Sequence, residues 1–316
     1  MTRLRRFFSH APNWIAVLLL LGCFATAIAA PQISPNDPDD PGPFMRVGRA
    51  GEGRPMPPSK TAPLGMLPRG FDVFHALVWG ARDALQFGLV VTLCTSIFGV
   101  FYGAAAGLIG GRVGGLLMNI VDSLLAFPVI AGVVFLQQLF AMTITSMGGL
   151  YFNNGQVMEF VGPMTVIQWA LEHVSPLMFS LIVLTWMPYA RLVHSVVLLL
   201  VRTEFVQAAR ALGGNFWWVI RKHIIPNSIS PALVLAARDI GGVVLLQATL
   251  TFIELGGDSV WGEMLALGRN WVIGPGGNLF RYWWVFLPPT LAVMLFGFAW
   301  NMLGDGLADM LDPHSI

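Results

Sequence analysis

Residues 204–226 read EFVQAARALGGNFWWVIRKHIIP. They form the longest segment away from the termini that is too polar to cross a bilayer and too poor in proline and glycine to be a flexible linker. The first half is predicted to be a short helix from Glu204 to Leu212. Thr203 suits its N-cap, and Gly213 stands just past its end, where a left-handed residue is favoured.

The second half is predicted to form another short helix, from Phe216 to His223, which Pro226 ends. Ala208 and Ala209 place small side chains on the first helix. Two short helices at a sharp angle present a compact knob, and small side chains let a partner's backbone approach closely. The segment is therefore predicted to dock into a groove on a partner protein. The alternative is an amphipathic interfacial loop between two membrane helices.

The order Gln207-Ala208-Ala209, three residues, Gly213 and, thirteen positions later, Pro226 resembles the Glu-Ala-Ala loop of ABC importer permeases. In that family the loop is cytoplasmic and docks the ATPase subunit. The resemblance implies an ATPase-coupling role for Glu204, Gln207, Ala208, Ala209, Arg210, Gly213 and Pro226. Three positions depart from the family pattern, namely Gln207 where Glu is usual, His223 where Ile is usual and Ile225 where Leu is usual.

The composition is that of a polytopic membrane protein. Hydrophobic residues make up 55% of the 316 residues and charged residues only 11%, whereas soluble proteins carry about 25% charged residues. The mean hydropathy is +0.68. A net charge of +1 gives no support for nucleic-acid binding. Cys23 and Cys94 both lie in apolar runs, where a disulfide is not expected.

Apolar runs predict six transmembrane helices and an all-α fold. The expected spans are Trp14–Ala30, Leu85–Ile109, Leu116–Ala141, Leu177–Leu200, Ser228–Leu255 and Tyr282–Leu303. The first run is predicted to be a retained helix, although the small residues before Pro31 also resemble a signal-peptidase site. One glycine in every four residues of the second span lets another helix approach closely. These glycines are Gly99, Gly103, Gly107 and Gly111.

The polar segments between the spans define the expected loops of a single permease domain, residues 1–316. Residues 31–80 are rich in proline and glycine and are predicted to form an extracytoplasmic loop. Residues 201–226 are the predicted cytoplasmic coupling loop. The remaining connections are a tight cytoplasmic turn at 110–115 and two further outer loops at 142–176 and 256–281.

Two further segments, Pro63–Arg82 and Asn301–Pro313, resemble the same importer class. The likeness is specific enough to indicate the second permease subunit of dipeptide, oligopeptide and nickel importers, with a type I ABC importer permease fold. It implies a heterodimer with another permease, two ABC ATPase subunits or domains that hold ATP and Mg, and an extracytoplasmic solute-binding protein. The solute stays open among peptides, nickel chelates, glutathione-like compounds and oligosaccharides.

Basic residues indicate the orientation. Six spans place both termini and the coupling loop on one side of the membrane. That side has eight basic residues in short flanking segments, namely Arg3, Arg5, Arg6, Arg112, Arg202, Arg210, Arg221 and Lys222, against Arg269 and Arg281 on the other. The positive-inside rule places the loop and both termini in the cytoplasm of a bacterial inner membrane.

Catalytic motifs are missing from the sequence. Lys60 and Lys222 are the only lysines, and neither follows the glycine pattern of a phosphate-binding loop. We therefore expect no enzyme activity, no cofactor and no catalytic or metal-binding residue on this chain. Two alternative classes are a secondary transporter and an intramembrane enzyme. The enzyme would need a pair such as Asp122 and Asp239, whose surroundings carry no supporting signal.

Polar residues inside the predicted spans are candidates for the translocation pathway. They are Asp122, Gln137, Gln138, Arg238 and Asp239. Arg238 lies ten residues into the fifth span, about 15 Å at 1.5 Å per residue and near the middle of a core about 30 Å thick. A charge at that depth must face protein or water. Arg238 and Asp239 are thus expected either to line the pathway or to pair with Asp122, Gln137 or Gln138 and hold the bundle together.

Overall fold

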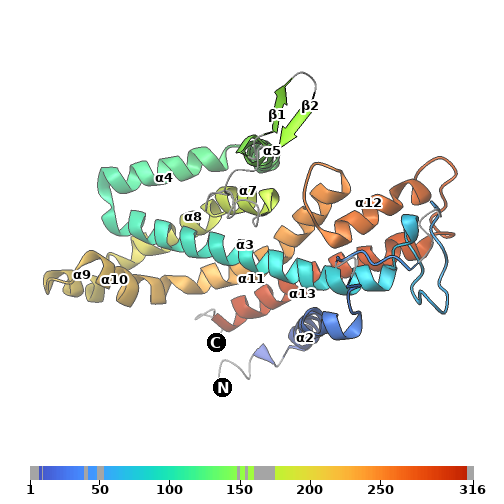
Figure 1. Cartoon of the computed structure of the whole chain (residues 1–316). Helices are drawn as coiled ribbons and strands as arrows, with labels where there is room; N and C mark the ends of the chain where they lie inside the picture. The colour runs from blue at the N-terminus through green and yellow to red at the C-terminus, as the bar shows by residue number, and fades with distance from the viewer. Residues whose placement is uncertain are drawn as a thin grey trace. The chain divides into compact units, whose positions relative to one another are not determined.

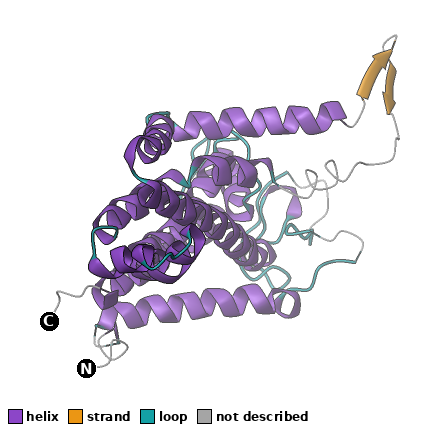
Figure 2. Cartoon of the chain, turned by 90° about the vertical axis from the view of Figure 1, so that its left-hand side faces the viewer, coloured by secondary structure: helices purple, strands orange, loops and turns teal. Residues whose placement is uncertain are grey.

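The computed structural model describes residues 7–8, 10–38, 42–47, 53–147, 150–153, 156–159 and 175–311. Most of these residues are helical (Figure 2). One antiparallel hairpin, β1 (Leu150–Asn153) with β2 (Gln156–Glu159), lies within the predicted second outer loop. The basic residues Arg3, Arg5 and Arg6, residues 160–174 of that loop, and Asp312 and Pro313 lie outside the described residues.

Five helices in the described part of the chain are long and apolar enough to cross a membrane. They are α2 (Ala11–Ile33), α3 (Val73–Ile109), α7 with α8 (Pro176–Leu184 and Met187–Leu200), the continuous helix Phe216–Phe252 and α13 (Trp283–Leu311). A sixth span is formed if α4 (Gly111–Leu125) and α5 (Val129–Met147) are counted together. The all-α membrane architecture is confirmed.

The third predicted span, Leu116–Ala141, is wrong as one straight helix. The chain bends by 89° between α4 and α5. Pro128 has no N–H and disfavours a helical residue before it, and Phe127 bonds back only three residues, to Leu124. The predicted turn at 110–115 is shorter than expected, since only Gly110 and Gly111 adopt positive φ, at 62° and 57°, and α4 begins at once.

Helix α3 begins twelve residues before the predicted Leu85, so residues 73–80 belong to a helix and not to the outer loop. Asp72 starts the helix by accepting a hydrogen bond from the Phe74 N–H at 3.0 Å. His75 is fully buried and joins Ser34 Oγ, at 2.7 Å, to the Gly42 carbonyl, at 3.1 Å. These contacts tie the polar outer loop to the first turn of α3.

The predicted outer loop at 256–281 contains a helix that sequence reasoning missed, α12 (Val260–Val272). Ser259 caps it by accepting a hydrogen bond from the Gly262 N–H at 3.2 Å. Trp261 is 3% exposed, and its indole N–H donates to the Leu77 carbonyl at 3.1 Å. The predicted third outer loop is therefore a packed element and not a free connection.

The chain divides into two compact units, residues 1–93 with 230–316, and residues 94–229. In the first unit, α2 and α12 both pack on α13. In the second, the end of α3 packs against α8, and a Cβ built on Gly103 would clash with the Ala190 carbonyl oxygen. The predicted close approach at the glycine stripe is confirmed for Gly99, Gly103 and Gly107. Gly111 is instead a turn residue with open space around it.

Candidate functional site: the loop between α8 and α11

The first predicted helix of the loop is present as α9 (Glu204–Ala211). Thr203 has extended N-cap geometry, but its hydroxyl donates to the Leu200 carbonyl at 2.5 Å and does not cap the helix. Gly213 has a φ of 82°, as its place after the helix predicted. The N–H groups of Gly213 and Gly214 close the end by donating to the Arg210 and Ala209 carbonyls.

The prediction that Pro226 ends the second helix is wrong. Helix α10 (Phe216–Val219) runs through a π-helical turn, η2 (Ile220–Ile224), into α11 (Ile225–Phe252). In that turn the Ile225 N–H donates to the Ile220 carbonyl, five residues back. Pro226 then sits in the first turn of α11, where a missing N–H is tolerated. The second half of the predicted coupling loop is thereby continuous with the helix that ends at Phe252.

The two alanines of the loop face opposite ways. Ala209 is buried by its own chain, together with Val206, whereas Ala208 and Gln207 are exposed. Leu212 is 88% exposed, the largest value among the exposed large apolar residues of the described chain. Sequence reasoning missed Leu212, although an apolar residue beside a glycine at the end of a polar helix was a usable signal.

Arg210 attaches α9 to another helix through its guanidinium group. Its guanidinium donates to the Leu108 carbonyl at 2.7 Å, across 102 positions of sequence. Leu108 lies in the last turn of α3, where a helix leaves carbonyls without intrahelical partners. Figure 1 shows α9 and α10 beside the turn that joins α3 to α4. The predicted coupling residue Arg210 is thus an anchor of the loop.

The second half of the loop presents aromatic and basic groups together. Asn215 caps α10 by accepting a hydrogen bond from the Trp218 N–H at 2.7 Å. Lys222 Nζ lies 5.4 Å from the centre of the Trp218 ring, within cation–π range. His223, where the importer family has Ile, lies between the rings of Trp218 and Phe205 at 4.9 and 6.1 Å. His223 therefore packs with both of these aromatic rings.

The remaining predicted coupling residues line the same loop. Gln207 turns back to its own chain, because its amide donates to the Arg202 carbonyl at 3.2 Å. Glu204 lies in the first turn of α9 and Arg210 in the last, which suits the helix dipole. Three exposed apolar residues of the loop, Ala208, Leu212 and Trp217, are together called the docking surface below.

Two of the charged pathway candidates have identified partners within their own units. Arg238 pairs with Asp305 of α13 at 2.5 Å. Asp122 lies 3.9 Å from Arg191 of α8. Gln137 is buried, Gln138 is exposed and Asp239 is half-buried.

The Arg238–Asp305 pair lies on a polar strip of the first unit. Its side chains are 46% and 67% exposed in the isolated chain. Asn301 and Asp309 are also exposed, four residues before and after Asp305 on α13, and residues at this spacing share one helix face. Charged groups within membrane spans face protein or water and not lipid. This strip is therefore expected to face the translocation pathway or another subunit.

Metal ligands do not gather in the described part of the chain, where no group of three or more His, Cys, Asp or Glu side chains could hold an ion. Helix α12 carries one perturbed carboxyl, Glu263. Burial raises the pKa of Glu263 above its ordinary value, and the Arg69 charge partly offsets this rise.

The known proteins that this chain resembles are all membrane components of transport systems. Residues 99–315 match the family described as "Binding-protein-dependent transport system inner membrane component". The chain is 30% identical to a probable D,D-dipeptide transport system permease protein of Escherichia coli, over 95% of this chain and 86% of that protein. It is 30% identical to a glutathione transport system permease protein of Pectobacterium atrosepticum, over 98% and 89% of the two chains. A dipeptide transport system permease protein of Bacillus subtilis is 27% identical, over 98% and 84%. Nothing in these matches favours a secondary transporter or an intramembrane enzyme.

Proposed function

Because this chain belongs to the family of binding-protein-dependent transport system inner membrane components, we propose that it serves an importer of short peptides or peptide-like solutes. It is a multi-pass permease subunit of an ABC importer. The three relatives are named for D,D-dipeptides, glutathione and dipeptides. All of these solutes are short peptides, which supports that substrate class.

The ATPase subunit is proposed to dock on the loop between α8 and α11. The observation that carries this proposal is the docking surface of Ala208, Leu212 and Trp217. Leu212 and Trp217 belong to the same loop and are 88% and 67% exposed, and large exposed apolar groups in one segment favour an interaction site. Arg210 holds this surface against α3, and the unbroken helix from Phe216 to Phe252 connects it to the membrane span.

ATP-driven closure of the partner ATPases would move this rigid loop and, through α11, switch the permease between its two facing states. In this proposal, ATP and Mg are bound by two ATPase subunits and this chain holds no cofactor of its own. A second permease completes the pathway, and an extracytoplasmic binding protein delivers the solute. The chain acts as a single permease domain in the bacterial inner membrane, with both termini in the cytoplasm.

Replacing Leu212 by Asp tests the docking proposal. The carboxylate would be buried without a partner in the ATPase interface, and such interface positions contribute at least about 2 kcal/mol, roughly thirtyfold in affinity. Leu212→Asp is therefore expected to lose copurification with the ATPases and ATP-driven uptake, while membrane insertion stays normal. Phe280→Asp is the matched control, since Phe280 is 87% exposed on the predicted outer side.

Variants of the two neighbouring alanines, Ala208 and Ala209, are expected to behave differently. Ala209 is buried by its own chain, so Ala209→Asp is expected to lower the stability of the permease as well as uptake. Ala208→Asp, on the exposed side of α9, is expected to behave like Leu212→Asp. Wild-type uptake and ATPase copurification by a well-expressed Leu212→Asp protein would overturn docking at this surface.

A further inference from the structure

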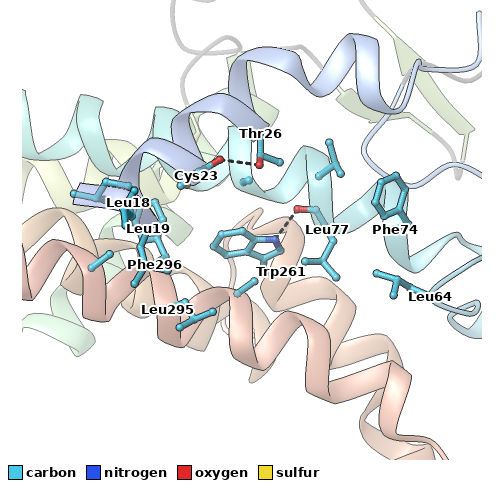
Figure 3. A pocket seen from close by; sticks show the side chains of 16 residues that line it. Leu18, Leu19, Cys23, Thr26, Leu64, Phe74, Leu77, Trp261, Leu295 and Phe296 are labelled. Carbon is cyan, nitrogen blue, oxygen red and sulfur yellow. Dashed lines mark hydrogen bonds between the residues drawn. The ribbon is translucent and has the colours of Figure 1, made fainter. Parts of the chain in front are cut away.

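An apolar cavity of about 410 Å³ lies within the unit formed by residues 1–93 and 230–316 (Figure 3). Its walls come from α2, the first turns of α3, Trp261 of α12, and α13. Leu18, Leu19 and Phe296 lie on one side of the Trp261 ring, and Phe74 and Leu64 lie beyond Leu77 on the other. The cavity is as large as those that bind small molecules.

The polar groups around the cavity are already paired. The Thr26 hydroxyl donates to the Gly22 carbonyl at 2.8 Å, and the Trp261 indole N–H donates to the Leu77 carbonyl at 3.1 Å. Cys23, a weak hydrogen-bonding group, is the remaining polar side chain of the lining. A buried water needs two to four polar partners, so the cavity favours hydrocarbon over water.

The lining of the cavity reaches the surface of the isolated chain. Leu18 of α2 and Leu295 of α13 line the cavity and are nevertheless 63% and 46% exposed. Helix α2 has 23 residues, about 35 Å at 1.5 Å per residue, and so matches a hydrocarbon core about 30 Å thick. Leu18 and Thr26 lie in the middle third of this helix. The opening between α2 and α13 therefore lies at the depth of the lipid chains.

We propose that this cavity binds one acyl chain of a membrane phospholipid, with Gly22 keeping the entrance open. A Cβ built on Gly22 would meet no atom within 4 Å. An extended acyl chain can lie along this apolar lining. This inference rests on the membrane location of the chain and is independent of ATPase docking.

Such a lipid would contact three elements at once. Trp261 reaches the cavity from α12, an element of the predicted outer loop, while the facing wall belongs to α2. An acyl chain between them would fill the space next to the Trp261 ring and pack α12 against the two spanning helices. The bound lipid is thus a structural ligand of the outer loop.

The test uses the complete transporter in bilayers that contain a phospholipid with a photoreactive diazirine in the middle of one acyl chain. Mass spectrometry then maps the labelled residues. Labelling is expected to concentrate on Leu18–Thr26 and Leu295–Ala299, several-fold above Leu116 of α4, which is 62% exposed and outside the cavity. Gly22→Phe fills the entrance and is expected to abolish the cavity labelling.

Matched controls keep the outcome interpretable. Leu21→Phe adds the same ring at the neighbouring position, which is 60% exposed and does not line the cavity, and should leave labelling unchanged. Gly22→Leu is a smaller filling variant should Gly22→Phe insert poorly. The thiol of Cys23 gives a second readout, because bound lipid should slow its reaction with a membrane-soluble maleimide, while the exposed Cys94 outside the cavity is unaffected.

Two results would overturn the proposal. One is cavity labelling no stronger than at Leu116 and unchanged by both Gly22 variants. The other is labelling that occurs in the separate subunit but disappears in the complete transporter, because a partner subunit would then cover the cavity. Retained uptake in Gly22→Phe with loss of cavity labelling would support lipid binding separately from transport.

Discussion

The ion pair of Arg238 and Asp305 has two alternative roles, either in the translocation pathway or in holding α11 and α13 together. Their contact at 2.5 Å joins α11 to α13 across 67 positions of sequence. Gly304 permits it, because a Cβ there would lie 2.5 Å from Arg238 Cγ. The pathway role of Arg238 remains a prediction, since the structure identifies its partner and not what it faces.

Arg238→Gln is expected to lose uptake, because it leaves Asp305 without its counter-charge in a membrane span. The double variant Arg238→Gln with Asp305→Asn removes both charges and is expected to regain thermal stability in detergent. If the pair lines the pathway, uptake stays low in the stable double variant. Recovery of uptake together with stability would limit the pair to holding α11 and α13 together.

Glu263 gives a pH dependence whose sign follows from burial. Because its folded-state pKa is raised, the folded protein holds this proton more tightly than the unfolded chain does. Its stabilising contribution is complete below the unfolded pKa of about 4.3 and is lost as pH rises through the folded pKa. Glu263→Gln should therefore melt at a higher temperature than the natural chain at about pH 8 and close to it at about pH 4. A melting difference that does not vary with pH would contradict this assignment.

At the scale of the element, one hydrogen bond attaches α9 to the end of α3. Arg210 donates to the Leu108 carbonyl, a charge-assisted bond worth about 1.5–3 kcal/mol. Without it, α9 would remain helical and keep Leu212 exposed, but its movement would no longer follow α3.

Arg210→Gln is thus expected to leave ATPase copurification intact and to reduce uptake per ATP hydrolysed. The measurement is the ratio of transport to ATPase activity in reconstituted vesicles. Arg221→Gln removes an exposed charge from the same loop and serves as the control. An unchanged ratio in Arg210→Gln would show that the anchor is unnecessary for coupling.

At the scale of the whole molecule, the orientation in the membrane is open to a direct test. The predicted topology places Leu212 in the cytoplasm and Phe280 outside, and both are nearly fully exposed. In intact cells, a membrane-impermeant thiol reagent should label Phe280→Cys and spare Leu212→Cys until the membrane is permeabilised. The opposite pattern would reverse the topology and remove the docking surface from the ATPases.

The sequence alone determined the class, the approximate spans and the first helix of the loop. These features depend on short-range chemistry, namely runs of apolar residues long enough to cross a bilayer and a glycine at the left-handed position after α9. Gly213 adopts that conformation because only its own backbone and its immediate neighbours are involved. The glycine stripe of α3 likewise predicted that another helix would pack closely against it. The sequence did not identify α8 as that helix.

Only the tertiary structure decided where helices bend, continue and pair. Pro128 and Pro226 look alike in sequence, yet the chain bends by 89° beside Pro128 and runs on through Pro226, where a π-helical turn rearranges the hydrogen bonds. The start of α3 depends on His75 contacting residues 33 and 41 positions away. The pairing of Arg238 with Asp305 and the burial of Ala209 likewise depend on packing, because distant parts of the chain set the geometry that local sequence leaves open.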